Sequence, residues 1–229
     1  MKRKTDFALT ALALLKGIQA ITHWPHMSIL LVRHGETALN AARIVQHPET
    51  PLNERGMGQA RRVAERLADF PVEAIVSSDY RRAHMTAEAI AAATGLPIVI
   101  QESLRERNFG EARGVPHADL PVDLYAPDFH PRGGESWSMF HERVTRAWQQ
   151  ITARAAGTEG DLVVVSHALV CRSLVENHLT LAPHMDATVP RWPNTALTVI
   201  DSHSPWEVTV LACGAHLGGE LADDSAARS

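Results

Sequence analysis

Cysteine, clustered basic residues and long apolar runs are all scarce in this chain of 229 residues. Its two cysteines, Cys171 and Cys213, are too few for a disulfide framework, so we expect reduced core thiols in a cytoplasmic protein. No apolar run is long enough for a helix that spans a bilayer, which argues against a membrane protein. No basic stretch alternates with aromatic residues, and this argues against nucleic acid as a partner.

The overall charge and composition set further limits. With a formal net charge of −4, the chain offers no general attraction for anions, so an anionic substrate would need a local cluster of arginines. The hydrophobic share of 45% is enough for one sizeable core, and no internal repeat is present. We therefore expect one domain, from residue 28 to residue 214.

Both ends of the chain differ from this domain. Residues 1–27 begin with a basic cluster and a short apolar stretch, a pattern shared by secretory signal peptides. No small-residue cleavage site follows, and Met27 directly precedes the first expected strand. We therefore interpret 1–27 as an N-terminal extension, either a loose appendage or a segment upstream of the true start. The small and polar residues 215–229 predict a flexible tail.

Between these ends, short apolar runs alternate with amphipathic stretches. The runs predict strands at 29–32, 74–77, 98–100, 162–166, 196–200 and 208–211. The stretches between them predict helices, with Met57, Ala83, Phe140 and Leu174 on their inward faces. This alternation predicts an α/β fold, a three-layer α/β/α sandwich with a mostly parallel central sheet.

Two segments depart from this alternation. The last two expected strands are too close together for a crossover helix, so they should form an antiparallel hairpin pair or lie at an edge of the sheet. The segment at about 110–135 holds four prolines and shows no sustained periodicity. A loop of this length in a compact domain is usually functional, and we expect it to be a lid.

Charged and imidazole side chains follow four of the expected strands. Residues 31–37 (Leu-Val-Arg-His-Gly-Glu-Thr) place Arg33 and His34 directly after the first strand. Arg82 and His167 come soon after the second and fourth strands, and Glu106 follows the third. Ligands bind beyond the carboxyl ends of parallel strands, so these side chains should meet at one edge. Two guanidinium groups and two imidazoles around one point suit a phosphoryl group.

Each of these residues also has a simpler interpretation. Arg82 would then be a solvated helix residue, and His167 a hydrogen-bonded core histidine. Glu106 would be an exposed loop carboxylate paired with Arg105 or Arg107. The strand-end position that the segments share favours a common site over three separate explanations.

At this point the chain resembles a known family. The motifs are residues 31–37, 77–86 with its Arg82-Ala83 step, 104–110 (Leu-Arg-Glu-Arg-Asn-Phe-Gly) and 165–167 (Val-Ser-His). In this order, from about residue 28 to residue 213, they are similar to the histidine phosphatase superfamily, the phosphoglycerate mutase-like group. One departure is 112–114 (Ala-Arg-Gly), where members often carry a glutamate before the glycine, so we expect a different pocket wall.

The resemblance implies a role for each site residue. His34 is the nucleophile that becomes phosphohistidine, and Glu106 is the proton donor. Arg33, Arg82 and His167 hold the phosphoryl oxygens and complete the catalytic set. The implied substrate-binding residues are Arg33, Asn40, Arg82, His167 and Ala168. No metal and no cofactor is expected, because the arginines and His167 offset the charge on the equatorial phosphoryl oxygens, a role that Mg²⁺ plays in many other phosphoryl transfers.

The resemblance therefore implies a metal-independent phosphomonoester hydrolase that acts on a small phosphorylated metabolite. Two alternatives stay open, phosphoryl transfer as in phosphoglycerate mutases and a phosphate-binding module without activity. Mutases of the family carry a long insertion between the matching glutamate and histidine, which closes the site against water. The span from Glu106 to His167 is short, and the shorter lid favours hydrolysis. The substrate itself stays open, since the lid mixes aromatic and basic side chains: Tyr125, Phe129, His117, His130 and Arg132.

Overall fold

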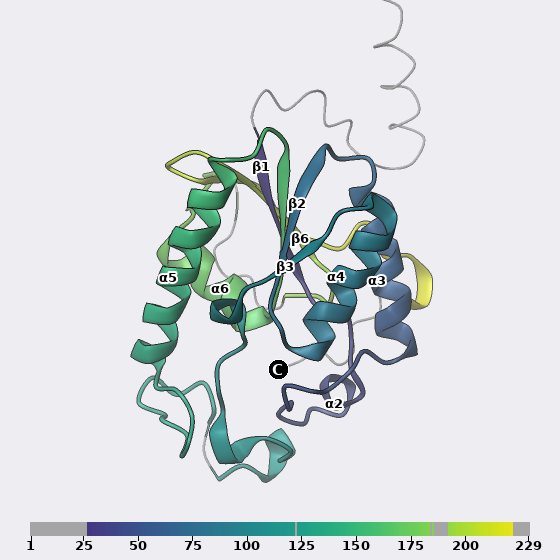
Figure 1. Cartoon of the computed structure of the whole chain (residues 1–229). Helices are drawn as coiled ribbons and strands as arrows, with labels where there is room; N and C mark the ends of the chain where they lie inside the picture. The colour runs from purple at the N-terminus through teal and green to yellow at the C-terminus, as the bar shows by residue number, and fades with distance from the viewer. Residues whose placement is uncertain (1–26, 122, 184, 186–191, 222–229) are drawn as a thin grey trace, which may run out of the picture.

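The computed structural model describes residues 27–121, 123–183, 185 and 192–221. A twisted sheet lies between two layers of helices (Figure 1). Helices α3 (Glu54–Leu67) and α4 (Arg81–Thr94) cover one face, and α5 (Trp137–Ala155) and α6 (Ala168–Asn177) cover the other. The expected three-layer α/β/α sandwich is confirmed. Most of the expected N-terminal extension, residues 1–26, lies outside the described residues, as do residues 222–229 of the expected tail.

The sheet has the strand order β3-β2-β4-β1-β6-β7-β5. Strands β3, β2, β4 and β1 run parallel, and β6 runs antiparallel to both of its neighbours. The predicted hairpin is therefore confirmed as β6–β7, whereas the two-residue strand β5 was not expected. The strand bounds are β1 Ser28–Arg33, β2 Val72–Ser77, β3 Ile98–Ile100, β4 Asp161–Ser166, β5 Thr180–Leu181, β6 Leu197–Asp201 and β7 Glu207–Cys213.

The two central strands are apolar on both faces because helices cover both sides of the sheet. All six residues of β1 are buried, and so are all six of β4. Along β1, Leu30 and Val32 pack with α3 and α4, while Ile29 and Leu31 pack with α5 and α6. This double burial fixes the register of β1, because a shift of one residue would exchange its two faces.

Local sequence signals set the limits of the helices. The Asn53 side chain caps α3 by accepting from the Gly56 amide at 2.7 Å, and Ser136 caps α5 in the same way. Two details of the prediction are wrong. Met57 is 39% exposed, because it lies at the edge of the buried stripe in the first turn of α3. Cys213 is half-buried rather than in the core, since it ends β7 beside the Arg66 side chain.

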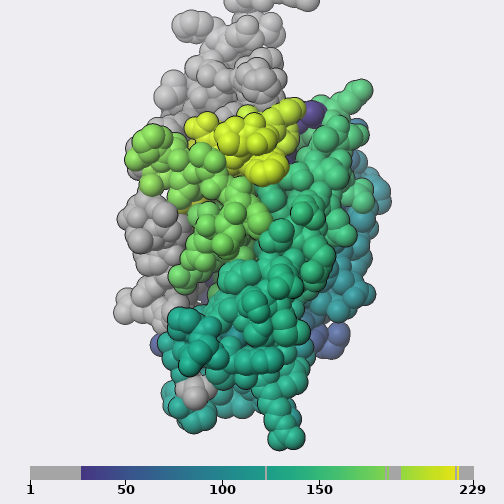
Figure 2. Space-filling model, turned by 90° about the vertical axis from the view of Figure 1, so that its left-hand side faces the viewer, coloured from purple at the N-terminus to yellow at the C-terminus, as the bar shows by residue number. Residues whose placement is uncertain are grey.

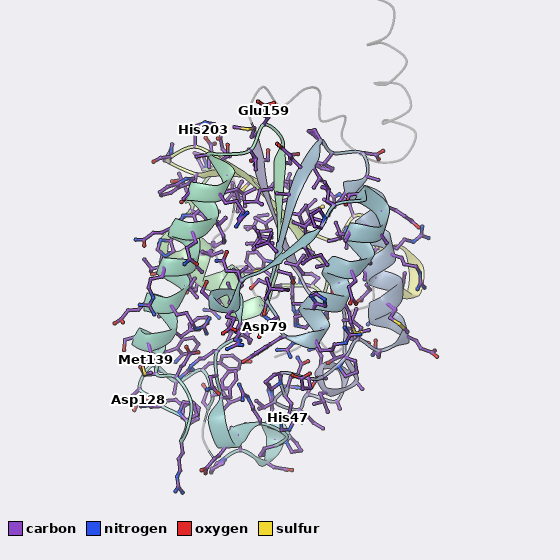
Figure 3. All side chains as sticks on the ribbon, in the orientation of Figure 1. His47, Asp79, Asp128, Met139, Glu159 and His203 are labelled. Carbon is purple, nitrogen blue, oxygen red and sulfur yellow. The ribbon has the colours of Figure 1, made fainter. Side chains whose placement is uncertain are left out.

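The carboxyl ends of the parallel strands all lie at one end of the molecule. In Figure 3, Asp79, which follows β2, lies near this end together with His47, whereas Glu159 and His203 lie at the opposite end. Figure 2 shows that the lid segment closes the same end below α5. Any site built from strand ends is therefore covered by the lid.

The lid is a folded loop with its own small apolar core. Its two ends lie so close together that a Cβ atom on Gly110 would overlap the Arg132 carbonyl oxygen. Leu124 in the lid packs on Phe109 and Val45, and all three are buried. None of the helices in the described part of the chain is both long and apolar enough to cross a membrane.

Candidate active site

His34 follows β1 directly and is buried, with 2% of its surface exposed. Its Nδ1 atom lies 2.7 Å from the Gly35 carbonyl oxygen, which can only accept a hydrogen bond. Nδ1 therefore carries the ring proton, and Nε2 keeps its lone pair. Burial, together with the nearby cations Arg82 and Arg33, holds the pKa of His34 well below its ordinary value. The ring is thus a neutral imidazole with a nucleophilic Nε2.

Arg82 lies in the first turn of α4 and is 2% exposed. Its Nε donates to Nε2 of His34 at 3.3 Å, and its Nη1 donates to the His47 carbonyl oxygen at 3.0 Å. Burial lowers the pKa of Arg82 to about 10, so the group stays charged at neutral pH. A fixed cation therefore stands beside the nucleophilic nitrogen.

Arg33, the last residue of β1, supplies a second buried cation. It donates to the Trp192 carbonyl oxygen and, at 3.3 Å, to Oδ1 of Asn40. Asn40 lies in the short helix α2 (Ala38–Ala41), where its backbone amide donates to the Thr37 side chain. Two contacts, one from each side, therefore fix the orientation of the Arg33 guanidinium.

His167 follows β4, the neighbour of β1 in the sheet. Its ring centroid lies 5.2 Å from that of His34, and its Nε2 lies 3.0 Å from Oγ of Ser78. Burial, Arg82 and the other nearby cations keep the pKa of His167 well below its ordinary value. Its Nδ1 is buried without a hydrogen-bond partner among the described residues. His167 thus lies against His34, and it is not among the described residues that line the cavity.

Glu106 is a half-buried carboxylate that lines the cavity, not the exposed loop residue of the simpler interpretation. Its two oxygens accept from the backbone amides of Arg107 at 3.0 Å and Leu169 at 3.2 Å. Burial raises the pKa of Glu106 despite these hydrogen bonds, which favours the protonated acid. Arg105, one of its suggested partners, instead pairs with Asp79.

The loop that carries Glu106 is held by Arg143 of α5. The Arg143 guanidinium donates to the carbonyl oxygens of Ser103 at 2.9 Å and Arg105 at 2.8 Å. It also forms two hydrogen bonds of 2.7 Å with Glu135, at the end of the lid. Burial alone would raise the pKa of Glu135, but these bonds and one from the Asn108 amide hold it below its ordinary value.

Arg107 ties the lid to the same loop. It is 1% exposed and donates to three backbone carbonyl oxygens, those of Glu135, Leu124 and Phe129. Its guanidinium also lies 3.9 Å from the ring centroid of Trp137. The residue next to the acid therefore anchors the lid.

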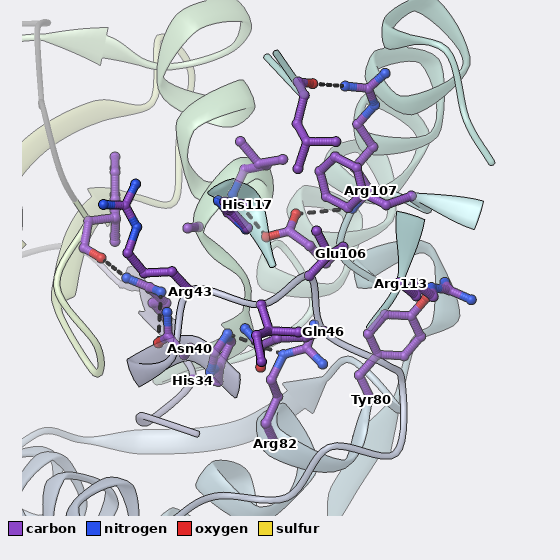
Figure 4. Close-up of a pocket in the computed structure, with 18 of the residues that line it drawn as sticks. His34, Asn40, Arg43, Gln46, Tyr80, Arg82, Glu106, Arg107, Arg113 and His117 are labelled. Atoms are coloured by element: carbon purple, nitrogen blue, oxygen red, sulfur yellow. Dashed lines mark hydrogen bonds between the residues drawn. The ribbon is translucent and has the colours of Figure 1, made fainter. Parts of the chain in front are cut away.

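These side chains surround a cavity of about 160 Å³ beneath the lid (Figure 4). The residues named from the sequence that line it are Arg33, His34, Asn40, Arg82, Glu106 and Ala168. Among its described lining residues, Glu106 carries the only carboxylate, while six arginines line the walls. Tyr125 and His117 of the lid also line the cavity, whereas His130 and Arg132 do not. The cavity is therefore strongly cationic in a chain of net negative charge.

The segment before β6 holds the backbone of the nucleophile, and sequence reasoning missed it. The side-chain amide of Asn194 donates to the His34 carbonyl oxygen at 3.0 Å. The Thr195 amide donates to the Arg33 carbonyl oxygen at 3.1 Å, and Thr195 has a positive φ of 57°. No apolar periodicity marks these residues, so the sequence alone offered no signal.

Comparison with known proteins supplies independent evidence for the family to which the chain is similar. The sequence profile of the histidine phosphatase superfamily (branch 1) matches residues 29–212. Phosphoglycerate mutase-like protein 4 of Arabidopsis thaliana is 35% identical over 207 residues, which cover 84% of this chain and 87% of that protein.

Two solved structures extend the comparison. A mycobacterial glucosyl-3-phosphoglycerate phosphatase aligns with a TM-score of 0.68 and 27% identity, covering 81% of this chain and 98% of that one. A putative α-ribazole-5′-P phosphatase of Escherichia coli aligns with a TM-score of 0.69 and 25% identity, covering 81% and 96%.

Proposed function

Because this chain belongs to the histidine phosphatase superfamily, we propose that it is a metal-independent phosphomonoester hydrolase that works through a phosphohistidine on His34. The observation that carries the proposal is the hydrogen bond from Nδ1 of His34 to the Gly35 carbonyl oxygen. It leaves Nε2 unprotonated, and a neutral imidazole is the form that attacks phosphorus. The other site residues supply what the reaction needs around this atom.

In the first step, Nε2 of His34 attacks phosphorus in line with the ester oxygen, forming the N–P bond as the P–O bond breaks. Arg33 and Arg82 hold the equatorial oxygens, and His167, whose buried Nδ1 has no hydrogen-bond partner among the described residues, lies against the His34 ring. Glu106, protonated because burial raises its pKa, gives its proton to the leaving alkoxide. The products are an alcohol and phospho-His34.

In the second step, the Glu106 carboxylate takes a proton from a water molecule, whose oxygen attacks the phosphohistidine. The N–P bond breaks, inorganic phosphate leaves, and both His34 and Glu106 return to their starting forms. Hydrolysis differs from mutase chemistry only here, where water rather than a second substrate hydroxyl accepts the phosphoryl group. The short, self-packed lid supports hydrolysis.

The cavity supports a small phosphorylated metabolite as substrate, since about 160 Å³ leaves no room for a macromolecule or a nucleic acid. We propose no macromolecular or membrane partner. The two free cysteines fit a reducing compartment, so we place the reaction in the cytoplasm.

The test is release of inorganic phosphate from p-nitrophenyl phosphate with a chelator present. We expect turnover together with an alkali-stable, acid-labile phosphoryl group on His34, and neither in His34→Ala. Conversion of a phosphoglycerate to its isomer without phosphate release would instead identify a mutase. Tight phosphate binding without turnover would identify a binding module and refute the proposal.

A further inference from the structure

The backbone of the nucleophile is held by Thr195, whose own conformation needs support. The Thr195 amide donates to the carbonyl oxygens of Arg33 at 3.1 Å and His34 at 3.3 Å. Thr195 has a φ of 57°, and a β-branched residue rarely adopts this left-handed conformation. Such backbone persists only where surrounding contacts hold it. One of these contacts comes from His216, which is not among the described residues that line the cavity.

We propose that His216 is a positioning residue for the nucleophile, because it holds Thr195 in the conformation from which the Thr195 amide fixes the backbone of His34. The inference rests on the proposed function, since it assumes that the placement of Nε2 of His34 decides the rate of phosphoryl transfer. It adds to the reaction a residue from the C-terminal end of the described chain, which acts only through Thr195.

The hydrogen bonds around the His216 ring define which nitrogen carries its proton. Nδ1 lies 3.3 Å from Nη1 of Arg66, and a guanidinium nitrogen can only donate, so Nδ1 accepts. The Thr195 hydroxyl donates to the Asn194 carbonyl oxygen at 2.7 Å. That hydroxyl therefore accepts the 3.1 Å hydrogen bond from the Nε2–H group of His216. One arrangement of protons thus satisfies the whole chain of contacts from Arg66 to Asn194.

The surroundings of His216 keep its ring neutral. Burial and the positive charge of Arg66 lower the pKa of His216 to about 4. Arg66 reaches the ring from α3, and Sγ of Cys213, at the end of β7, lies 3.4 Å from the same guanidinium nitrogen. A second proton on Nδ1 would face this guanidinium directly. The neutral ring is therefore the form that Arg66 can hold against Thr195.

The segment that carries His216 is itself attached to α3. Its last described residue, Leu221, has a carbonyl oxygen that accepts from the side chains of Arg55 at 3.1 Å and Gln59 at 3.4 Å. In Figure 1 this segment, coloured yellow, lies beside α3. Residues 215–221, which the sequence predicts to belong to a flexible tail, therefore hold the imidazole in place from one side.

Two substitutions of His216 test the proposal. In His216→Gln the amide can still donate to Thr195 and accept from Arg66, so phosphohistidine formation should stay close to the wild-type rate. His216→Leu can do neither, and we expect this rate to fall by about 10- to 100-fold, because a displaced reacting group loses rate. The affinity for substrate should change little. Single-turnover release of nitrophenolate from p-nitrophenyl phosphate measures both quantities. Equal losses in the two variants, or no loss in His216→Leu, would overturn the proposal.

His178 provides a matched control. Its Nε2 lies 3.1 Å from the Thr145 hydroxyl, which is the same pairing at the same distance as in the contact of His216 with Thr195. His178 follows α6, on the other face of the sheet, and it is not among the described residues that line the cavity. His178→Leu should therefore leave phosphohistidine formation at the wild-type rate. A loss as large as that in His216→Leu would show that the effect is not specific to the nucleophile.

A double variant tests whether His216 acts through Thr195. Thr195→Val keeps the β-branched shape and removes the hydroxyl that His216 contacts. If the two residues act as one unit, their effects on the rate do not add. We expect the double variant His216→Leu/Thr195→Val to be no slower than the slower of the two single variants. Additive losses would show that His216 acts by another route.

Hydrogen exchange at the Thr195 amide separates this inference from the proposed function. The amide is protected by its bonds to the Arg33 and His34 carbonyl oxygens. NMR without substrate should show exchange about tenfold faster in His216→Leu, and protection as in the wild type in His216→Gln. This result is expected even if the protein proves not to be a hydrolase. Unchanged exchange in His216→Leu would overturn the positioning role and leave the phosphatase proposal intact.

Discussion

The Nε atom of Arg82 donates a hydrogen bond to Nε2 of His34, and both side chains are almost fully buried. This contact places a permanent cation against the nitrogen that must stay unprotonated. It therefore suppresses protonation of His34 at the same time as it prepares a site for the phosphoryl charge. The pH dependence of the reaction follows from this arrangement.

We expect the rate with alkyl phosphates to be highest at mildly acidic pH. His34 becomes inactive only when pH falls through its lowered pKa, so activity persists into acid. Glu106 must be protonated to act as the acid, and its raised pKa keeps it protonated to a higher pH than an ordinary glutamate. Activity should then fall as the pH rises through the pKa of Glu106. The dependence of kcat/KM on pH tests this prediction. Glu106→Gln should lose the alkaline limb, and a limb that persists would rule out Glu106 as its source.

The second prediction concerns the leaving group. Glu106→Gln removes the proton donor, so kcat/KM for an alkyl phosphate, which reports formation of the phosphohistidine, should fall by about 10²- to 10⁴-fold. The kcat/KM for p-nitrophenyl phosphate should fall much less, because nitrophenolate leaves without a proton. Steady-state rates for the two esters give the comparison. Equal losses would show that the acid is another residue.

Arg143 provides a test of positioning. Arg143→Lys cannot reach the carbonyl oxygens of the 103–105 loop and Glu135 together, so the acid should move while the phosphate cations stay. We expect kcat with alkyl phosphates to fall and KM to change little. The basic limb of the pH profile should also shift. An unchanged kcat would show that the Glu106 loop holds its position without Arg143.

The Glu135–Arg143 pair should also contribute pH-dependent stability. The pKa of Glu135 is lowered in the folded protein, so its contribution is present above the unfolded pKa and is lost as pH falls through the folded value. Glu135→Gln should cost about 1 kcal/mol of unfolding free energy at neutral pH, because the pair is only partly buried. The difference in unfolding free energy between Glu135→Gln and the wild type should become smaller at acidic pH. Denaturant unfolding at several pH values measures it, and a constant difference would contradict the linkage.

The lid should loosen when Arg107 is replaced. In Arg107→Lys a single ammonium cannot serve three separated carbonyl oxygens or stack on Trp137 as a guanidinium does. We expect faster proteolytic cleavage within the lid and a raised KM. Arg132→Lys is the control, since that side chain is 86% exposed and forms an ion pair with the exposed Glu111. Equal cleavage in both variants would contradict the anchoring role.

Much of the site follows from strand ends. Arg33, His34 and His167 are the residues that follow two apolar runs, and the parallel pairing of β1 with β4 brings them side by side. The Arg82 position is predictable for the same reason, because α4 begins just after β2. In these cases, the residues that the local sequence pattern indicates are the same residues that the fold brings to the site.

Other contributors could not be predicted, for physical reasons. Arg143 occupies a polar position of the amphipathic helix α5. At such a position the hydrophobic periodicity indicates only a charged side chain exposed to solvent. Asn194 acts on a backbone carbonyl that is 160 residues away in the sequence. The left-handed backbone of Arg43 depends on contacts with the lid, which has no periodicity to interpret. Each depends on long-range contacts between irregular segments.

The pairing of β1 with β4 has one more consequence, for how this active centre comes into being. The two strands join residues that are 133 positions apart, as the bond from the Ser28 amide to Asp161 shows. Closing so long a loop is slow compared with forming the helices between them. No fragment of the chain that lacks either strand can assemble the cationic pocket. Recovered enzymatic turnover would therefore mark the completion of refolding, after the helical signal has already returned.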